Sequence, residues 1–261
     1  MASHSPMSPG LPSRFFAAFV ILFLLEPIAI AMIVAFSSGD RLEFPIPGFS
    51  LRWFGIALSK PQYIEGLTVS VIIGLGNAII ATIAGTGAAL ALNHYRFRGR
   101  SVVQAIVMLP IAMPAIVLGL GLLFTLSIYH MEPGMLAGTF GHAVLGVPYV
   151  VAMVTSALSN YDRSVERASM SLGVGPVMTF FKVTLPQIRG GVIAGGVAAF
   201  LISFDNISLS LFITRGDTLP LRLMQQLLAY ADPSISAIST LLVLVSLVGM
   251  VFLLPLAMRQ R

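Results

Sequence analysis

An all-α integral membrane protein is the fold class that the sequence predicts, and its composition is the first reason. The chain of 261 residues is 57% hydrophobic and only 10% charged, with a mean hydropathy of +0.94. An ordinary soluble domain is about a quarter charged. The second reason is that long apolar runs recur along the whole chain. The third is that the charged residues gather in the short stretches between those runs, which favours membrane loops over a nucleic-acid surface despite a net charge of +5.

Six apolar runs are candidates for membrane-spanning helices, because each approaches or exceeds the roughly 20 residues that a bilayer requires. They comprise residues 15–36, 66–92, 102–127, 140–158, 191–213 and 235–257. The third run contains Pro110 and Pro114, which we expect to kink it. In the second run Gly85 and Ala89 are four residues apart, a spacing that lets two helices approach closely.

The basic residues indicate how these runs are oriented. With six spans both termini lie on one side, together with the loops at 93–101 and 159–190, and this side holds ten of the fifteen Lys and Arg residues. Because Lys and Arg are enriched in cytoplasmic loops, we expect both termini to be cytoplasmic. The predicted divisions are a disordered N-terminus at 1–13, a first span with an external segment at 14–65, a core at 66–257 and a tail at 258–261.

The loop at 160–190 is long for a simple connection. Asp162 to Met170 has the pattern of a short helix, Gly173 to Pro176 should break it, and a second helical piece should follow and end at Leu185-Pro186. Four apolar side chains would then lie along this helix–break–helix segment: Met170, Leu172, Phe180 and Phe181. They either pack on the protein's own helices or form a docking surface for a partner.

This loop resembles the "EAA" loop of the permeases of binding-protein-dependent ABC importers, whose pattern is E-A-A-x-x-x-G, nine residues, then I-x-L-P. The matching positions are Gly173, Val183, Leu185 and Pro186. The Glu and the two Ala of the pattern fall on Arg167, Ala168 and Ser169, and Glu166 stands one residue early. The resemblance leaves open whether Glu166 or Arg167 makes the polar contact to the partner.

The resemblance extends over about residues 66–257. It is most similar to the spermidine/putrescine branch through SFDNISLSLFITRGDTLPLRL at 203–223. It implies six transmembrane helices, with a cytoplasmic coupling helix between the fourth and fifth, in an inner-membrane subunit that forms half of a translocation pathway. The implied partners are a second permease that is a copy or a paralogue, two cytoplasmic ATPases and an external binding protein that delivers the solute.

Motifs for chemistry within the chain are missing. The sequence contains no G-x-x-x-x-G-K-[ST], HExxH or G-x-S-x-G. It has no cysteine, and His94 and His142 have no second ligand at a metal-binding spacing. We therefore expect a transporter subunit and not an enzyme, with no metal site and no cofactor of its own. ATP and Mg would be bound by the partner ATPase.

Asp205 is the candidate contact for the solute. It falls within the fifth apolar run, where an ionisable side chain is by default a functional candidate. A continuous helix would place Ser208 on the same face and Phe212 one turn beyond. An acid beside a hydroxyl and an aromatic ring suits a polyamine-like organic cation, whereas a structural hydrogen bond to a neighbouring helix is the alternative.

Other functions remain open at this point. The same class of importer could carry an amino acid-like compound, an aminophosphonate or an inorganic ion. A passive channel or a membrane scaffold is a further possibility, although neither requires a loop that docks an ATPase.

Overall fold

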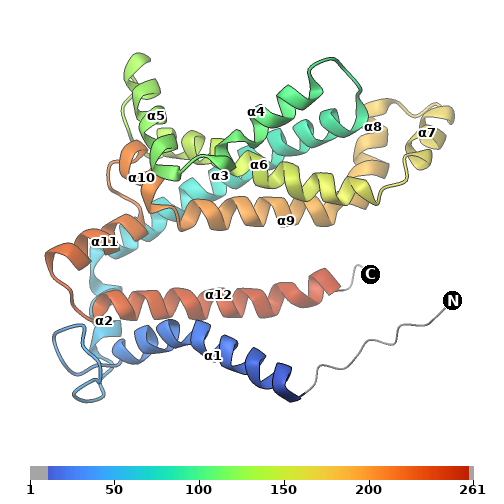
Figure 1. Ribbon diagram of the computed structural model, residues 1–261. Coiled ribbons are helices and arrows are strands. Elements are labelled where there is room, and N and C mark those ends of the chain that lie inside the picture. Colours follow the sequence, from blue (N-terminus) through green and yellow to red (C-terminus); the bar gives the residue numbers. More distant parts are fainter. Residues whose placement is uncertain (1–10, 259–261) are drawn as a thin grey trace. The chain divides into compact units, whose positions relative to one another are not determined.

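The computed structural model describes residues 11–258, and in these residues every regular element is a helix. The helices are α1 (Leu11–Val34), α2 (Arg52–Ser59), α3 (Pro61–His94), α4 (Arg100–Ala112), α5 (Ala115–Ile128), α6 (Met135–Ser159), α7 (Ser164–Ser171), α8 (Pro176–Thr179), a π-helical turn (Phe180–Thr184), α9 (Leu185–Phe204), α10 (Ile207–Ile213), α11 (Leu219–Ala229) and α12 (Ser234–Met258) (Figure 1). The predicted all-α class is confirmed for this part of the chain.

Four of these helical runs are long and apolar enough to cross a membrane. They are Pro12–Val34, Pro61–His94, Met135–Ser159 and Pro176–Phe204. A fifth candidate is the pair α4 and α5, which bends by 109°. The bend falls at Met113 and Pro114, and Pro114 is one of the two prolines that were expected to kink this run. The helix is broken here and not merely kinked, because α4 ends at Ala112 and α5 begins at Ala115. The last predicted span lies on α12, whose part Ser234–Val248 is apolar but shorter than these.

Three predicted boundaries differ from the helices of the structure. The fifth span was expected to be one helix over 191–213, yet α9 ends at Phe204 and α10 is a separate helix. The predicted disordered N-terminus at 1–13 is too long, because α1 begins at Leu11; residues 1–10 lie outside the described part of the chain. The division expected between residues 65 and 66 falls inside the unbroken helix α3.

The chain forms two compact units, one containing the residues up to Pro61 and from Gln226 onward, and the other containing Gln62–Gln225. In the first unit α12 packs beside α1 and α2. A polar clasp stabilises this unit, in which Asp232 accepts hydrogen bonds from Lys60 Nζ at 3.1 Å and from the backbone N–H of Ser234 at 2.9 Å. Since Asp232 is 5% exposed, these donors replace the water that burial removes.

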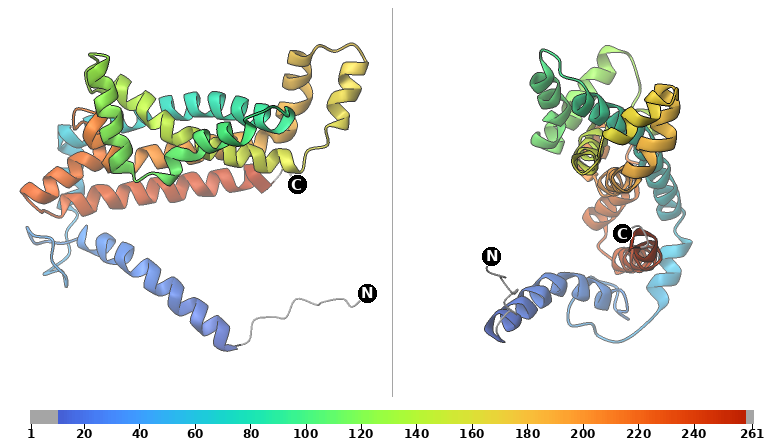
Figure 2. Two further views of the ribbon diagram at one scale, coloured as in Figure 1. Left: turned by 45° about the horizontal axis from the view of Figure 1, so that its top comes forward. Right: turned by 90° about the vertical axis from the view of Figure 1, so that its right-hand side faces the viewer.

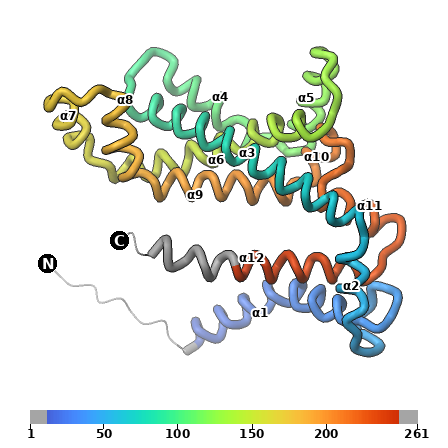
Figure 3. The backbone as a smooth tube through the Cα atoms, turned by 180° about the vertical axis from the view of Figure 1, so that it is seen from behind, coloured from blue at the N-terminus to red at the C-terminus, as the bar shows by residue number. Residues whose placement is uncertain are grey.

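In the second unit α6 and α9 run side by side, and α3 packs against both of them (Figures 2 and 3). Small residues make this packing close. A Cβ atom at Gly85 of α3 would lie 2.7 Å from Cβ of Val150 in α6, and Ala89 is fully buried in the same core. The close helix approach expected at Gly85 and Ala89 is therefore confirmed. Asn77 Nδ2 also donates to the Ala199 carbonyl at 2.7 Å, which ties α3 to α9.

The second unit has an interrupted helix at each end of α9. The segment α7–α8 precedes α9 at one end, and the break between α9 and α10 lies at the other (Figures 1 and 3). Since α9 has 20 residues, about 30 Å separates these two places. The predicted site residues lie in these two places or in the helical turns next to them.

Candidate functional site

The segment between α6 and α9 has the predicted helix–break–helix form. Helix α7 begins after Asp162, whose carboxylate accepts the backbone N–H of Ser164 at 2.8 Å and its hydroxyl at 2.6 Å. These two hydrogen bonds hold the pKa of Asp162 below its ordinary value. A carboxylate in this position also interacts favourably with the helix N-terminus.

Gly173 ends α7 in a left-handed conformation, with φ of +82°. Its N–H donates to the Met170 carbonyl at 3.0 Å, and the N–H of Val174 donates to the Ser169 carbonyl at 3.3 Å. This pair of bonds is the Schellman motif, which favours glycine because a Cβ is strained at positive φ. The expectation that the helix breaks between Gly173 and Pro176 is confirmed, since α7 ends at Ser171 and α8 begins at Pro176.

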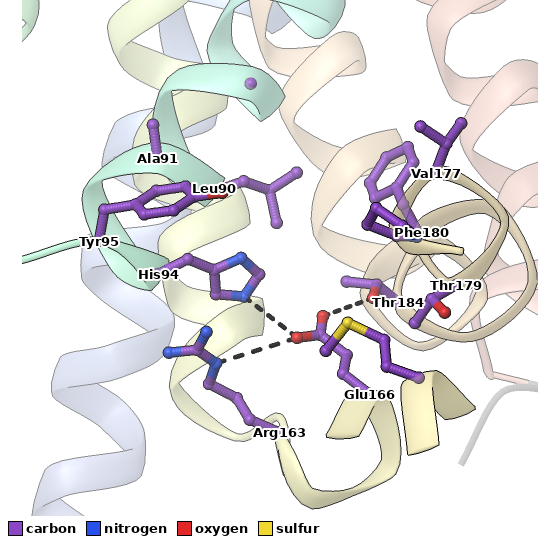
Figure 4. A pocket seen from close by; sticks show the side chains of 13 residues that line it. Leu90, Ala91, His94, Tyr95, Arg163, Glu166, Val177, Thr179, Phe180 and Thr184 are labelled. Carbon is purple, nitrogen blue, oxygen red and sulfur yellow. Dashed lines mark hydrogen bonds and ion pairs between the residues drawn. The ribbon is translucent and has the colours of Figure 1, made fainter. Parts of the chain in front are cut away.

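Glu166 points inward from α7 towards the end of α3 and the start of the α9 run (Figure 4). It is 8% exposed, and its Oε1 accepts the Thr184 hydroxyl at 2.5 Å. Its Oε2 lies 3.7 Å from Nε2 of His94 and 3.9 Å from Nε of Arg163. One carboxylate thus contacts three elements of the second unit.

Tyr161 extends this network by one hydrogen bond. Its hydroxyl lies 3.4 Å from Oγ1 of Thr184. Because Thr184 gives its only hydroxyl proton to Glu166, Tyr161 must donate to Thr184. Burial raises the pKa of Tyr161 above its ordinary value, which keeps that donor protonated. The hydrogen bonds are therefore donated in one direction, from Tyr161 to Thr184 and from Thr184 to Glu166.

The other three residues of the EAA-like stretch differ in their surroundings. Arg167 and Ala168 are exposed. Ser169 is half-buried, and its hydroxyl lies 3.0 Å from that of Thr179, so it joins α7 to α8. Of the two residues left open by the sequence, Glu166 is thus held inside and Arg167 faces outward.

Apolar side chains cover the outer surface of the same segment. Leu172 is 85% exposed, Val177 70% and Phe181 58%, with Met170 and Met178 beside them in the sequence at 45% and 49%. Phe180 is only half-buried and lines a cavity of about 480 Å³, together with Glu166 and His94 (Figure 4). Of the four apolar side chains that the sequence singled out, Leu172 and Phe181 are exposed, Phe180 lines the cavity, and Met170 is partly exposed and also lines the cavity.

Leu185 and Pro186 do not end the loop as expected, since the helical run continues through them from Pro176 to Phe204. The π-helical turn Phe180–Thr184 precedes them directly. Pro186 has no N–H for an α-helical bond to Lys182, and its ring would crowd that carbonyl. A wider turn relieves this conflict. A proline two residues into a helix was the sequence signal that the prediction took for a terminus.

Asp205 does not lie on a helix face. It follows the last residue of α9, is exposed, and its N–H donates to the Leu201 carbonyl at 3.2 Å. Asn206 then caps α10, because its Oδ1 accepts the N–H of Leu209 at 2.8 Å. The expected continuous helix through Asp205 and Ser208 is therefore wrong.

Ser208 and Phe212 do share α10, and both are half-buried. The Phe212 ring lies against Gly119 of α5, where an added Cβ would be 2.8 Å from Cδ2 of that ring. The structure thus brings Asp205, Ser208 and Phe212 to one break and the short helix that follows it. The cost of burying a carboxylate, which motivated Asp205, does not apply to this exposed position.

His142 is a feature of this region that the sequence did not reveal. It is 1% exposed and lies between Ser203 of α9 and Ser210 of α10. In the sequence, His142 was considered only as a metal ligand, and its spacing to other ligands did not indicate this contact with the two serines. No cluster able to hold a metal occurs in the residues that the structure describes. The available sequence signal for a buried polar contact here was the pair Ser203 and Ser210, which stand on either side of Asp205.

An all-helical subunit with several membrane spans and a helix–break–helix segment between two of them is the class that this geometry defines. Residues 81–259 match the family described as the binding-protein-dependent transport system inner membrane component. The chain belongs to this family, and it is a multi-pass inner-membrane permease component of an ABC importer.

Individual relatives agree with this assignment. The chain is 32% identical to the putrescine transport system permease protein PotI of Escherichia coli, over 92% of this chain and 89% of PotI. It is 28% identical to the spermidine/putrescine transport system permease protein PotC of Escherichia coli, over 89% of each.

A solved bacterial ABC transporter involved in the import of the acidic polysaccharide alginate has a similar fold, with a TM-score of 0.67 at 15% identity. The match covers 98% of this chain and 99% of that one. At this identity the likeness concerns the fold alone.

Proposed function

We propose that this permease subunit carries a polyamine-like organic cation across the inner membrane and forms half of the translocation pathway. The observation that carries this proposal is the similarity to PotI, at 32% identity over nearly the whole chain. The similarity to PotC, a permease of a spermidine/putrescine transport system, supports the same class of solute.

The partners in this proposal follow from the family. A second permease, either a copy or a paralogue, completes the pathway, and two cytoplasmic ATPases bind ATP and Mg. An external binding protein delivers the solute. The permease chain itself performs no hydrolysis.

The segment α7–α8 is the proposed ATPase contact and coupling helix. Its exposed apolar side chains, above all Leu172 and Val177, are suited to a protein partner, because a group of exposed apolar residues tends to mark an interface. Arg167 is exposed and supplies the outward polar contact. Glu166 keeps the segment attached to α3 and α9 through His94 and Thr184, so that movement of one is passed to the other.

The orientation belongs to the same proposal. The α7–α8 segment and both termini face the cytoplasm, as the ten-to-five distribution of Lys and Arg indicates. We expect an impermeant thiol reagent to label Ser50→Cys in intact cells and not Ser171→Cys. Labelling of Ser171→Cys in sealed cells would overturn the orientation.

The proposed cation contact is the break between α9 and α10. Asp205 supplies a carboxylate at the C-terminal end of α9, where the helix dipole also favours positive charge. The Ser208 hydroxyl can accept a hydrogen bond from an ammonium group, and the Phe212 ring can contact its cationic end. The exposed position of Asp205 keeps the carboxylate accessible to a passing solute.

The test compares Asp205→Asn with the matched control Glu132→Gln, which alters an acid that is 82% exposed in its side chain. Uptake of radiolabelled putrescine should fall about tenfold in Asp205→Asn, because a charge-assisted hydrogen bond is lost. It should be unchanged in the control, with equal amounts of assembled complex in both. Normal uptake by Asp205→Asn would reject the contact, and wild-type transport of a solute without an amine would reject the solute class.

A further inference from the structure

His142 occupies a buried seam between three helices of the second unit. The side chain projects from α6, and its two ring nitrogens reach two other helices. Nδ1 lies 3.0 Å from Oγ of Ser203 in the last turn of α9, and Nε2 lies 3.2 Å from Oγ of Ser210 in α10. The ring therefore bridges the two sides of the break that contains Asp205.

The hydrogen bonds define which ring nitrogen carries the proton. Ser210 donates its hydroxyl proton to the Asn206 carbonyl at 2.8 Å, so towards His142 it can only accept. Nε2 must then be the donor to Ser210. In a neutral ring Nδ1 is the acceptor, and the Ser203 hydroxyl donates to it. All three side-chain bonds are satisfied in this single arrangement.

Glycines bring α6 close enough for this bridge to form. A Cβ atom at Gly138 would lie 2.9 Å from Cγ2 of Thr214, and one at Gly141 would collide with Ile213. At the start of α6 the N–H of Gly134 donates to the Ile213 carbonyl at 3.0 Å. The backbone of α6 thus rests on the end of α10, and His142 bonds to Ser210 in the middle of that short helix.

The break itself has few contacts that would hold its direction. Asn206 caps α10 and receives the Ser210 hydroxyl on its carbonyl, and both of those bonds lie on the α10 side. Across the break, the N–H of Asn206 donates to the Ser203 carbonyl at 3.3 Å, and the Ser203–His142–Ser210 bridge joins the side chains of α9 and α10. Without the ring, the angle at Asp205 would be set by this backbone bond and by apolar packing around Leu209 and Ile213, which is not directional.

We propose that His142 is a positioning residue for the solute contact: it bridges Ser203 and Ser210 and so fixes the direction in which Asp205 is presented. This inference rests on the proposed cation contact at Asp205. It predicts that His142 acts on transport through Asp205 and does not contact the solute. A loose break would let the carboxylate adopt several directions, and misplacement of a binding group lowers the rate of the step that it assists.

The experiment is a double-mutant cycle on the assembled complex with its ATPases, partner permease and binding protein in proteoliposomes. The variants are His142→Leu, Asp205→Asn and the two combined, and the readout is putrescine imported per ATP hydrolysed. His142→Leu should lower this ratio about fivefold and should lower it no further in the Asp205→Asn background, because both changes affect one interaction.

Two controls make each outcome decisive. Ser70→Ala removes another buried interhelical bond, from the N–H of Leu219 at 2.9 Å, and should leave the ratio unchanged. If His142→Leu does not accumulate, the same cycle is run with Ser203→Ala, which removes a single hydroxyl.

Additive losses, or an equal loss in Ser70→Ala, would overturn the positioning role while leaving the cation contact intact. An unchanged ratio in Asp205→Asn alone would instead reject the proposed contact and, with it, the role of His142.

Discussion

At one end of the helical run Pro176–Phe204 the acidic side chain is buried and the apolar side chains are exposed; at the other end the reverse holds. Glu166 is 8% exposed beneath Leu172 and Val177, which are 85% and 70% exposed. At the break after α9, Asp205 is exposed, whereas Leu209 and Ile213 are fully buried. The first arrangement is suited to a protein partner and the second to a small polar solute.

The polar residues that stabilise the two regions also differ. Beside α7 a buried carboxylate collects a hydroxyl, an imidazole and a guanidinium from neighbouring elements. At the break an imidazole and two hydroxyls perform this task, and the carboxylate of Asp205 is exposed. Beside α7 the carboxylate of Glu166 itself fixes the segment, whereas at the break the bonds that fix the segment are made by His142 and the carboxylate of Asp205 is exposed.

The largest effect is expected at Glu166. Glu166→Ala removes the acceptor of the Thr184 hydroxyl, so this buried hydroxyl loses its hydrogen bond and the segment loosens. Putrescine uptake should fall by more than about tenfold in whole cells. Glu132→Ala, an exposed acid, should have no effect, and normal uptake by Glu166→Ala would remove the proposed link between α7 and α9.

A smaller effect is expected from the backbone at Gly173. Gly173→Ala places a Cβ at φ of +82°, which costs about 1–2 kcal/mol, although the space around it is open. Gly175→Ala is the matched control, because Gly175 also has open space but a φ of −63°. Uptake should fall about fivefold in the first variant and remain normal in the second. Equal behaviour of the two would show that the turn geometry is not needed for coupling.

The smallest effect concerns Asp232, an acid outside both regions. Burial alone would raise its pKa, but hydrogen bonds from Ser234 and Lys60 outweigh burial and hold the pKa below its ordinary value. A lowered pKa means that the folded state binds fewer protons than the unfolded state. The clasp therefore stabilises fully above about pH 4 and loses its contribution as the pH falls through the folded-state pKa.

Thermal unfolding of the purified subunit between about pH 3 and pH 7 measures this contribution. The wild type should lose stability below about pH 4 more steeply than Asp232→Asn, which has no carboxylate to protonate. Equal slopes would mean that the Lys60–Asp232 clasp does not contribute to the pH dependence.

Local signals made the first region predictable. Asp162 before a short helix, glycine at its end and the proline of α8 each act within a few residues, so the helix–break–helix form follows from the sequence. The π-helical turn was not predictable, because Pro186 can equally start a helix or sit behind a widened turn, and the surrounding structure decides.

The second region was misread because its local signal for a break, the pair Asp205-Asn206, lies inside a long apolar run. The apolar run continues to Ile213, and a continuous span was the reasonable prediction. The break depends on contacts with α6, namely the close approach at Gly138 and Gly141 and the bridge through His142. His142 is 61 positions from Ser203 and 68 positions from Ser210 in the sequence. No pattern within the apolar run could therefore reveal this bridge.

The division of roles between the two regions is tested most directly by ATP hydrolysis in the reconstituted complex, with and without loaded binding protein. In Asp205→Asn the binding protein should still stimulate hydrolysis while putrescine imported per ATP falls. In Glu166→Ala the stimulation itself should be lost, because the signal no longer reaches the ATPases. Loss of stimulation in Asp205→Asn, or its retention in Glu166→Ala, would contradict the assignment of solute contact to one end of α9 and coupling to the other.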